Sequence, residues 1–449
     1  AGLFGSNSGT ITKLSVKGTV SGKGGTGGIS GFNSGTISMC MFQGSVQGTA
    51  YVGGITGKNE QYAYVINCFT SAEVTGEVNV GGICGYNDVG YVNKCVSVGT
   101  VSGTNSDSTG SVCGYSRGSS GNLSNCIFDN EKSSVVGSNG SESYYASGQT
   151  TEWLSGSSLA AGLDYSEWNA GSTSVTPDGD DSRFGTKTTF YFSLKGVGEP
   201  VSTGKDTAVY NFGYDGRTDW QEFTLIETPE AFAEIGTDSA NWTENYVLAG
   251  DLDLSGQTLS KIGVYYQNNA AQSTAFTGKF SGDGHCLENV LIDDTGDCAS
   301  LFANNSGLIM NLSVKGKVNG HFFIGGICAY NGSGGMIYGC TFEGKAGGSS
   351  NDSIGGICGE NHGRIKNCYS SGDVDGYNNV GGVAGYNSGS VTVCYNTGTV
   401  SGAAYVGGVC GGNGSAGTVS DCFNAGKVPG RKYVGGVVGN NSGNITSCY

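Results

Sequence analysis

The sequence predicts an all-β protein built as a parallel β-solenoid (β-helix), and three observations carry this prediction. A motif of the form V-G-G-I-x-G-x-N recurs along the chain, and each copy is followed by a second motif, G-x-[IV]-x-x-C. A short G-x-V-x-G segment then completes the period. The apolar runs between these signals are short and rich in Val and Ile, which favours strands over helices.

The repeat length sets the geometry of the predicted coil. Neighbouring copies are between 26 (residues 26 to 52) and 30 (residues 324 to 354) positions apart. One such unit cannot bury its own apolar face, so it must stack on its neighbours. We therefore expect one repeat of three short strands per coil, about 4.8 Å between coils, and around five coils in an array. The copies occupy 26–33, 52–59, 80–87, 324–331, 354–361, 380–387, 406–413 and 434–441, with a decayed copy at 109–116.

Each recurring position has an expected structural role. Glycine permits tight corners, and the spacing of Val and Ile in V-G-G-I requires a bend at the glycine pair to bury both side chains. The recurring Asn can form a hydrogen-bonded ladder from coil to coil. This column contains Asn7, Asn33, Asn59, Asn87, Asn305, Asn331, Asn361, Asn387, Asn413 and Asn441. The position before V-G-G varies, and we expect it to face solvent: Tyr51, Asn79, Phe323, Ser353, Asn379, Tyr405 and Tyr433.

A longer period divides the chain into two homologous units. Residues 1–22 match residues 299–320 at an offset of 298. We predict a first solenoid at 1–135, a non-repeat cap or linker section at 136–219, a lead-in section at 220–298 and a second solenoid at 299–449. Since each unit lacks a section that the other has, we expect the chain to be a fragment of a longer tandem array.

Two short helices are predicted in the non-repeat sections. Residues 150–163 and 228–236 have helical character, and Thr228 followed by Pro229 is a favourable N-cap and first-turn pair. Helices at these places could cover open solenoid ends, which otherwise expose strand edges.

The composition excludes several classes of protein. The formal net charge is −15, which argues against nucleic-acid binding. No apolar run approaches the roughly 18 residues of a spanning helix, so we expect no membrane insertion in this segment. Charged residues are 13% and apolar residues 37% of the chain, a balance that favours a folded core over disorder.

The 16 cysteines fall mainly into two columns. One column follows the glycine pair, where Ser30, Thr56, Ala384 and Val438 replace cysteine in other coils. Because these substitutes are small, we expect buried free thiols. No C-x-x-C pair occurs, which argues against zinc binding. The [IV]-x-x-C column contains Cys40, Cys68, Cys95, Cys126, Cys340, Cys368, Cys394, Cys422 and Cys448, and the other contains Cys84, Cys113, Cys328, Cys358 and Cys410, while Cys286 and Cys298 lie in the lead-in section.

The histidines and the Gly-rich segment give no catalytic or cofactor-binding prediction. His285, His321 and His362 have no second His or suitably spaced acid near them in sequence. The segment "GKGGTG" (22–27) fits G-x-G-x-x-G, but a glycine content of 84 in 449 makes such matches common by chance.

The acidic segments give no metal or catalytic site either. "DLDLSG" (251–256) opens like a calcium loop, but its twelfth position is Ile262, so a half-buried strand is favoured. "PDGDDS" (177–182) is more typical of a solvated turn than of a calcium site. The repeat acids are scattered over coils, which disfavours a polysaccharide lyase or hydrolase. These acids are Asp88, Asp373, Asp375 and Asp421.

The repeated motifs resemble a known family. Gly2-Leu3-Phe4-Gly5, the repeated G-G-[IV]-x-G-x-N and the following G-x-[IV]-x-x-C resemble the GLUG-motif repeats of bacterial surface proteins, and residues 246–293 resemble the lead-in coils before such repeats. Together these segments cover about three quarters of the chain. The resemblance implies a pectin-lyase-like β-helix in a secreted or wall-attached protein. It supplies no catalytic residues, and the H-E-x-x-H motif of peptidases that accompany such repeats is absent here.

The sequence therefore favours a non-catalytic, extracellular adhesion protein that presents repeated faces to host, matrix or glycan ligands. We expect no catalytic, cofactor-binding or metal-binding residues, and varied positions such as Tyr51 and Tyr405 would form the binding face. Two alternatives stay open: a carbohydrate-active β-helix enzyme, and an accessory segment of a larger secreted peptidase.

Overall fold

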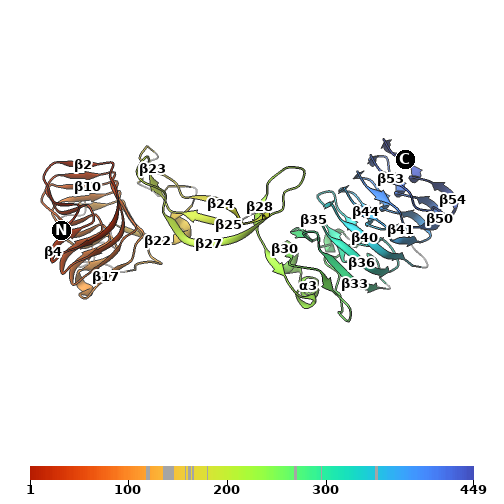
Figure 1. Cartoon of the computed structure of the whole chain (residues 1–449), viewed down its shortest axis with the longest axis horizontal. Coiled ribbons are helices and arrows are strands. Elements are labelled where there is room, and N and C mark those ends of the chain that lie inside the picture. Colours follow the sequence, from red (N-terminus) through yellow and green to blue (C-terminus); the bar gives the residue numbers. More distant parts are fainter. Residues whose placement is uncertain are drawn as a thin grey trace. The chain divides into compact units, whose positions relative to one another are not determined.

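The computed structural model describes residues 1–117, 122–134, 146–156, 158–159, 163, 166–178, 181–266, 270–294, 296–348 and 352–449. Strands make up 55% of the chain, against roughly 20–25% in an average globular protein. The strands stack in parallel as about 15 turns of β-solenoid, which confirms the predicted fold (Figure 1). The chain divides into two compact units, one formed by residues 1–181 and 185–207, the other by residues 182–184 and 208–449.

Four parallel ladders form the solenoid of the first unit. The register steps from Phe4 to Ser30, to Thr56 and to Cys84, so each coil contains 26 to 28 residues in this part of the array. The ladders are β1 (Phe4–Asn7), β5 (Ser30–Asn33), β9 (Thr56–Asn59), β14 (Cys84–Asp88), β19 (Cys113–Arg117); β2 (Thr10–Thr12), β6 (Thr36–Ser38), β10 (Tyr64–Ile66), β15 (Tyr91–Asn93), β20 (Leu123–Ser124); β4 (Gly24–Gly27), β8 (Ala50–Gly53), β13 (Val78–Gly81), β18 (Thr109–Gly110); and β3 (Ser15–Ser21), β7 (Met41–Gln47), β11 (Phe69–Thr70), β12 (Glu73–Gly76), β16 (Val96–Ser97), β17 (Val101–Gly103), β21 (Cys126–Asp129), β22 (Ala146–Gln149).

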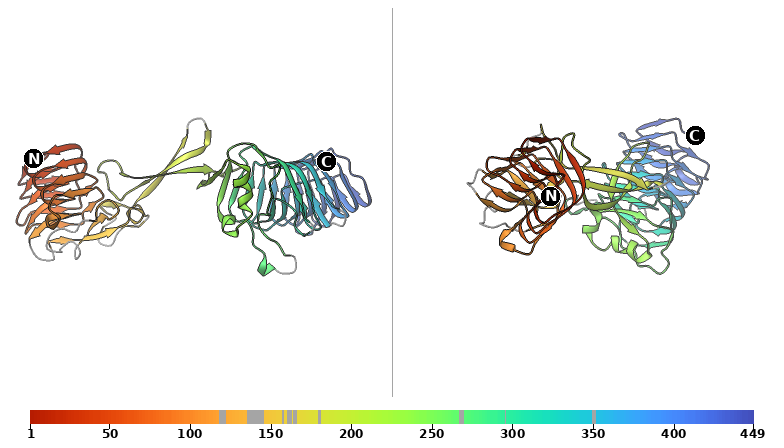
Figure 2. Two further views of the ribbon diagram at one scale, coloured as in Figure 1. Left: turned by 90° about the horizontal axis from the view of Figure 1, so that it is seen from below. Right: turned by 60° about the vertical axis from the view of Figure 1, so that its left-hand side comes forward.

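The second unit repeats this arrangement over more coils. Figure 2 shows its strands stacked side by side along the array. Two of its ladders are β29 (Thr224–Ile226), β30 (Asn245–Leu248), β32 (Lys279–Ser281), β35 (Leu308–Met310), β39 (Met336–Tyr338), β43 (Arg364–Lys366), β48 (Ser390–Thr392), β52 (Thr418–Ser420), β56 (Asn444–Thr446); and β34 (Phe302–Asn305), β38 (Cys328–Asn331), β42 (Cys358–Asn361), β47 (Ala384–Asn387), β51 (Cys410–Asn413), β55 (Val438–Asn441).

A third ladder of the second unit contains 13 strands, because β50 joins two faces of the coil. Its members are β31 (Leu252–Asp253), β33 (Cys286–Asp293), β36 (Ser313–Asn319), β37 (Ile324–Gly325), β40 (Thr341–Gly347), β41 (Asp352–Gly355), β44 (Tyr369–Ser370), β45 (Asp373–Asp375), β46 (Asn378–Gly381), β49 (Tyr395–Asn396), β50 (Val400–Gly407), β53 (Phe423–Asn424) and β54 (Gly430–Gly435).

The coil has four strand positions rather than the three that we predicted. The V-G-G-I motif is divided by a bend, so that Val80 lies in β13 while Ile83 precedes β14. Both side chains are fully buried, which confirms the bend expected at the glycine pair. A Cβ on Gly82 would lie 2.1 Å from the carbonyl oxygen of Ser111, so only glycine fits at this corner.

Two further corners have left-handed backbone that the sequence analysis missed. The residue before V-G-G has a positive φ, for example 55° at Tyr51 and 55° at Tyr405. The residue before the [IV]-x-x-C cysteine does too, including Val393 at 56°, although β-branched residues rarely adopt this conformation. Because the corners recur in every coil, these positions are constrained by the backbone as well as by what they display.

The recurring asparagines form hydrogen-bonded ladders inside the coils, as predicted, but in two columns, one in each unit. The side-chain amide of Asn33 donates to Asn59 Oδ1 at 2.8 Å, and that of Asn361 donates to Asn387 Oδ1 at 2.8 Å. Each amide also donates to backbone carbonyls at the corner, such as that of Gly363. These four side chains are fully buried, so their rungs satisfy polar groups that water cannot reach.

The predicted helices differ in how much of each forms. Helix α3 (Pro229–Ile235) matches its prediction, with Thr228 Oγ1 accepting from the Ala231 amide at 3.2 Å. Its Phe232 packs edge-on against Phe280 of the second core. Helix α2 is limited to Thr151–Leu154, and part of the predicted 150–163 helix lies outside the described residues. The 3₁₀ turns are η1 (Ser106–Ser108), η2 (Ser239–Thr243) and η3 (Ala270–Gln272).

The section between the repeats is antiparallel, and the part that belongs to each unit packs onto that unit's own solenoid. Its strands are β23 (Trp168–Asn169) with β26 (Ser193–Leu194), and β24 (Ser172–Asp178), β25 (Asp181–Phe190), β27 (Ser202–Asn211) and β28 (Trp220–Glu222) in a second sheet. In the first unit, Trp168 and Phe192 pack against Met41 and Phe69.

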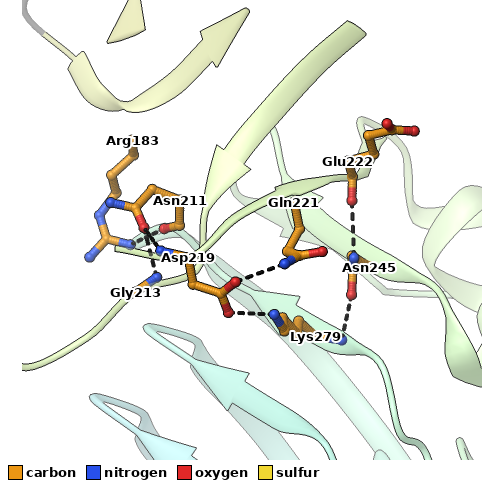
Figure 3. A network of polar contacts seen from close by, with 8 residues as sticks. All are labelled: Arg183, Asn211, Gly213, Asp219, Gln221, Glu222, Asn245 and Lys279. Carbon is orange, nitrogen blue, oxygen red and sulfur yellow. Dashed lines mark hydrogen bonds and ion pairs between the residues drawn. The ribbon is translucent and has the colours of Figure 1, made fainter. Parts of the chain in front are cut away.

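In the second unit, the segment 208–223 packs against the solenoid through its aromatic residues. Tyr210 and Phe212 contact Leu308 and Met310 in a buried cluster. Figure 3 shows the polar contacts beside this cluster, where Asp219 accepts hydrogen bonds from Lys279 and Gln221.

Candidate functional site

The position before each ladder asparagine is displayed on one face of the solenoid. Coil stacking aligns Tyr330, Glu360 and Tyr386 at this position in the second unit, whereas Asn304 of the preceding coil is buried. Tyr265, from the lead-in section, stacks on Tyr330 with ring centroids 3.8 Å apart and an interplanar angle of 13°. This face therefore carries an aromatic and acidic row whose spacing is set by the ladder beneath it.

His362 extends this row through a chain of hydrogen bonds. Its ring lies 5.0 Å from that of Tyr330, its Nε2 is 2.8 Å from Glu360 Oε1, and Ser388 Oγ is 2.7 Å from its Nδ1. Serine also occupies the Ser388 column at other coils of both repeats, so Ser388 belongs to the frame. The members with serine are Ser8, Ser34, Ser306 and Ser442. The contacts fix the imidazole ring against Tyr330.

Our prediction that no acid lies near the histidines is wrong. Besides the Glu360 contact, His285 Nδ1 lies 3.3 Å from Asp251 Oδ1, and His321 Nδ1 lies 3.4 Å from Asp297 Oδ1. Asp251 and Asp297 approach from other coils, at sequence separations of 34 and 24 residues, whereas Glu360 is only two residues from His362 and was overlooked. All three histidines lie at the surface, where a carboxylate partner is readily accommodated.

A cavity of about 690 Å³ lies at the lead-in end of the same unit. Trp242, Tyr265 and Tyr266 supply aromatic lining, and Lys261 and Asp297 supply charge. The loop after α3 and the corner around Gly263 bring these residues together. Gly263 has a φ of +83°, and a Cβ added to it would lie 2.5 Å from the Asn304 carbonyl oxygen, which favours glycine at this corner. The volume is within the roughly 300–1,000 Å³ of typical ligand pockets.

Ion pairs and burial define the electrostatics of this cavity. Lys261 Nζ lies 2.6 Å from Asp294 Oδ2 and donates to the Asp297 carbonyl at 3.0 Å. Burial raises the pKa of Asp294, but the hydrogen bond from Lys261 outweighs it, so this pKa falls below its usual value. Burial also raises the pKa of the Cys298 thiol to about 12, which keeps it protonated and unreactive near neutral pH.

The sequence analysis did not single out Trp242, Tyr265 or Tyr266. The available signal was the clustering of all four Trp between residues 150 and 245, next to a section without repeats. Aromatic walls with a few charged groups are suited to a small polar ligand with apolar faces, such as a sugar ring.

Many tyrosines on the surface of the repeats pack their rings against one another. Tyr405 stacks on Tyr433 at 4.9 Å, and Tyr51 is tilted against Tyr86 at 5.4 Å. Similar pairs are Tyr64 with Tyr91, Tyr86 with Tyr115, and Tyr369 with Tyr395. Such rings offer mainly edges to a ligand. Within the described chain, the exposed tyrosines whose rings contact no other aromatic ring are Tyr62, Tyr266 and Tyr377.

The expectation that the position before V-G-G faces solvent is wrong in two coils. Phe323 and Ser353 are only 6% and 5% exposed. Phe323 packs edge-on against Tyr265, because the lead-in section covers that coil. Tyr433 is exposed, and the other members are half-buried.

The cysteines line the interior of the coils as free thiols. Cys394 Sγ donates to the Thr392 carbonyl at 3.2 Å and accepts from the Cys368 amide at 3.4 Å. Burial raises the pKa of the Cys368 and Cys394 thiols well above the usual value. All except Cys448 are buried, so these columns are packing elements of the core.

The calcium-like segments and the Gly-rich segment have structural positions. In "DLDLSG", Leu252 and Leu254 are buried, while the Asp251 carboxylate accepts from the Cys286 amide at 2.8 Å, as expected for a half-buried strand. "GKGGTG" contributes strand β4. "PDGDDS" lies partly outside the described residues.

The repeat acids make separate local contacts. Asp88 pairs with Lys58 at 3.5 Å and with Arg117 at 3.4 Å in the first unit. In the second unit, Asp373 accepts from the Thr399 amide and Asp375 from the Ser401 hydroxyl, while Asp421 forms a left-handed corner. Among the described residues, no group of three or more His, Cys, Asp or Glu side chains is placed to hold a metal ion. No helix in the described ranges has the length and apolar character needed to cross a membrane.

Comparison with known proteins identifies a known motif in one of these repeats. The GLUG motif matches residues 350–375, which include β41 to β45. No curated protein sequence matches the chain. A crystal structure of a "putative immunoglobulin A1 protease" from Bacteroides ovatus is similar to it, with 22% identity, a TM-score of 0.41, and coverage of 54% of this chain and 77% of that chain. The chain therefore carries a GLUG motif on a β-solenoid fold.

Proposed function

We propose that this chain belongs to a non-catalytic bacterial protein of the cell exterior, which binds glycans through the cavity lined by Trp242, Tyr265 and Tyr266. The cavity carries the proposal, because it combines aromatic rings with charged groups in a volume suited to one or two sugar rings. Sugar rings pair apolar C–H faces with hydroxyl edges, which match aromatic faces and a Lys–Asp rim.

The solenoid supports this function by holding the cavity on a stiff base. Ala303, in the same strand β34 as the ladder residue Asn305, lines the cavity, and Tyr265 stacks on Tyr330 of the following coil. Preorganised aromatic groups lose little conformational entropy on binding, which favours affinity. The extracellular location and the adhesion role belong to the proposal and rest on the GLUG motif.

The experiment is a glycan array probed with the labelled wild-type chain and with two variants. Tyr266→Ala removes a ring that is 50% exposed in the cavity, and Tyr62→Ala removes one that is 66% exposed in the first unit. We expect Tyr266→Ala to weaken glycan binding about tenfold and Tyr62→Ala to leave it unchanged. An array without bound glycans, or equal losses in both variants, would contradict the proposal.

A turnover assay separates binding from catalysis. The glycans that the array identifies are incubated with the chain, and reducing ends and unsaturated products are measured. We expect none above the background of a heat-denatured sample. Product formation would replace the proposal with the alternative of a carbohydrate-active enzyme.

A further inference from the structure

A second groove lies at a glycine corner of the second unit, away from the cavity. Its volume is about 460 Å³, and Gly376, Gly402 and Gly430 of three successive coils lie along it. A Cβ on Gly402 would lie 2.9 Å from a methyl group of Val380 and 3.0 Å from one of Val406, both fully buried. Glycine therefore lets the backbone sit directly on the core, which lowers the floor of the groove. Three coils span about 10 Å, or roughly two sugar rings.

The residues beside this floor have free binding groups. Tyr377 is 59% exposed, and no other ring of the described chain stacks on it. Arg431 is exposed, and no carboxylate among the described residues lies within ion-pair distance of it. Asp375 accepts a hydrogen bond from the Ser401 hydroxyl at 2.6 Å, which fixes both side chains in the groove.

One segment beside the groove is basic, although the lining itself contains one cation, Arg431, and one carboxylate, Asp375. The net charge is −15, yet Lys427, Arg431 and Lys432 lie within six positions and are all exposed. A guanidinium group favours carboxylates, because its planar donors match the two oxygens. A free tyrosine face beside it favours the C–H face of a sugar ring.

We propose that this groove binds an acidic saccharide, with the uronate carboxylate on Arg431 and a sugar face on Tyr377. This inference deepens the proposed glycan-binding function and rests on it. Ser401 and Asp375 would hold sugar hydroxyl groups. A nucleotide also offers an anion and a stacking face, but the acidic chain repels long phosphate backbones, so we treat nucleotide binding as an outcome of the test.

The first unit offers a matched groove at the same corner. That groove has a volume of about 310 Å³ and is lined by Gly48, Gly76 and Gly103, with Glu77 and without an aromatic or basic side chain. The repeat frame therefore builds the groove in both units, and the displayed side chains give only the second one a preference for anions.

The test is isothermal titration calorimetry of the whole chain with digalacturonic acid, neutral galactobiose and uridine monophosphate. We expect digalacturonic acid to bind most tightly and more weakly as salt is added. Arg431→Gln should weaken digalacturonic acid binding at least tenfold and leave galactobiose unchanged, while Tyr377→Ala should weaken both. Asp375→Asn should strengthen acidic binding, because it removes a repelling charge.

The controls separate this inference from the proposed function. Glu77→Gln and Tyr395→Ala, which change the first groove and a stacked ring, should have no effect. Equal affinity for the acidic and neutral disaccharides, unchanged affinity in Arg431→Gln, or tighter binding of uridine monophosphate would each overturn the inference. Glycan binding that Tyr266→Ala weakens and Arg431→Gln does not would retain the cavity and reject the groove.

Discussion

The two solenoids share one frame but cover different faces of it. In the first unit, the residues directly after the [IV]-x-x-C cysteines are apolar, and the section around Trp168 and Phe192 buries them. These covered residues are Met41, Phe69, Val96 and Ile127. In the second unit, the same column is polar or aromatic and is not covered in this way. Its members are Thr341, Tyr369, Tyr395, Phe423 and Tyr449.

The second unit instead covers the strand that precedes the cysteine. Leu308 and Met310 are buried there under Tyr210 and Phe212. The corresponding residues of the first unit are Thr10 and Thr12, which are exposed. The comparison teaches that buried columns specify the coil, while a few outward side chains decide which face another segment occupies.

The shared frame is the most sensitive part of this comparison. A Cβ on Gly356 would lie 2.2 Å from Ser370 Oγ and 2.3 Å from the Gly382 carbonyl, whereas Gly436, in the same column of the last coil, has no atom within 4 Å. We expect Gly356→Ala to lower the free energy of unfolding by about 3–5 kcal/mol and Gly436→Ala by less than about 0.5 kcal/mol. Urea unfolding followed by circular dichroism measures the free energy of unfolding of both variants. Similar losses in the two variants would show that the glycine column does not act through close packing.

The asparagine ladder gives the next largest effect. Asn361→Ala removes the bond to Asn387 and leaves the Asn331 amide without its Oδ1 acceptor in a dry interior. We expect a loss of about 2–4 kcal/mol, since each buried group left unpaired costs about 1–3 kcal/mol. Asn441→Ala is the control, because that rung is exposed to water. If hydrogen exchange finds the second unit equally protected in both variants, the ladder is not a main source of stability.

These frame features also show how far the sequence could predict the structure. The period, the bend at Gly82 and the asparagine ladders follow from recurrence, because repeated residues must stack in register. The left-handed corner at Val393 could not be predicted, since its residue type opposes that conformation. The repeat register places Ser388 beside His362, a contact that the sequence analysis missed. The cavity at Trp242 depends on how the lead-in section folds back, which no repeat encodes.

Exchanging outward residues tests the comparison most directly. Leu308→Thr with Met310→Thr gives the second unit the residues of the first, and we expect the segment 208–223 to lose about 2–3 kcal/mol of docking energy. Hydrogen exchange of that segment measures the loss, while the ladder below should keep its protection. Thr10→Leu with Thr12→Met is the reciprocal control and should leave 208–223 unchanged. Unaltered exchange in the first double variant would mean that other contacts select the covered face.

The ion pair beside this docked segment is expected to give the smallest effect. Burial raises the pKa of Asp219, but hydrogen bonds from Lys279 and Gln221 outweigh it and lower this pKa (Figure 3). The pair therefore stabilises docking above the unfolded pKa of about 4, and this contribution is lost as the pH falls through the lower folded value. Asp219→Asn should cost about 1 kcal/mol near neutral pH, a size limited by partial exposure, and should flatten the acid dependence of exchange at 208–223. The control is Asp253→Asn, which removes a carboxylate that contacts Asn289 instead of the docked segment. If the acid dependence of exchange persists in Asp219→Asn, docking depends on the aromatic cluster and not on this ion pair.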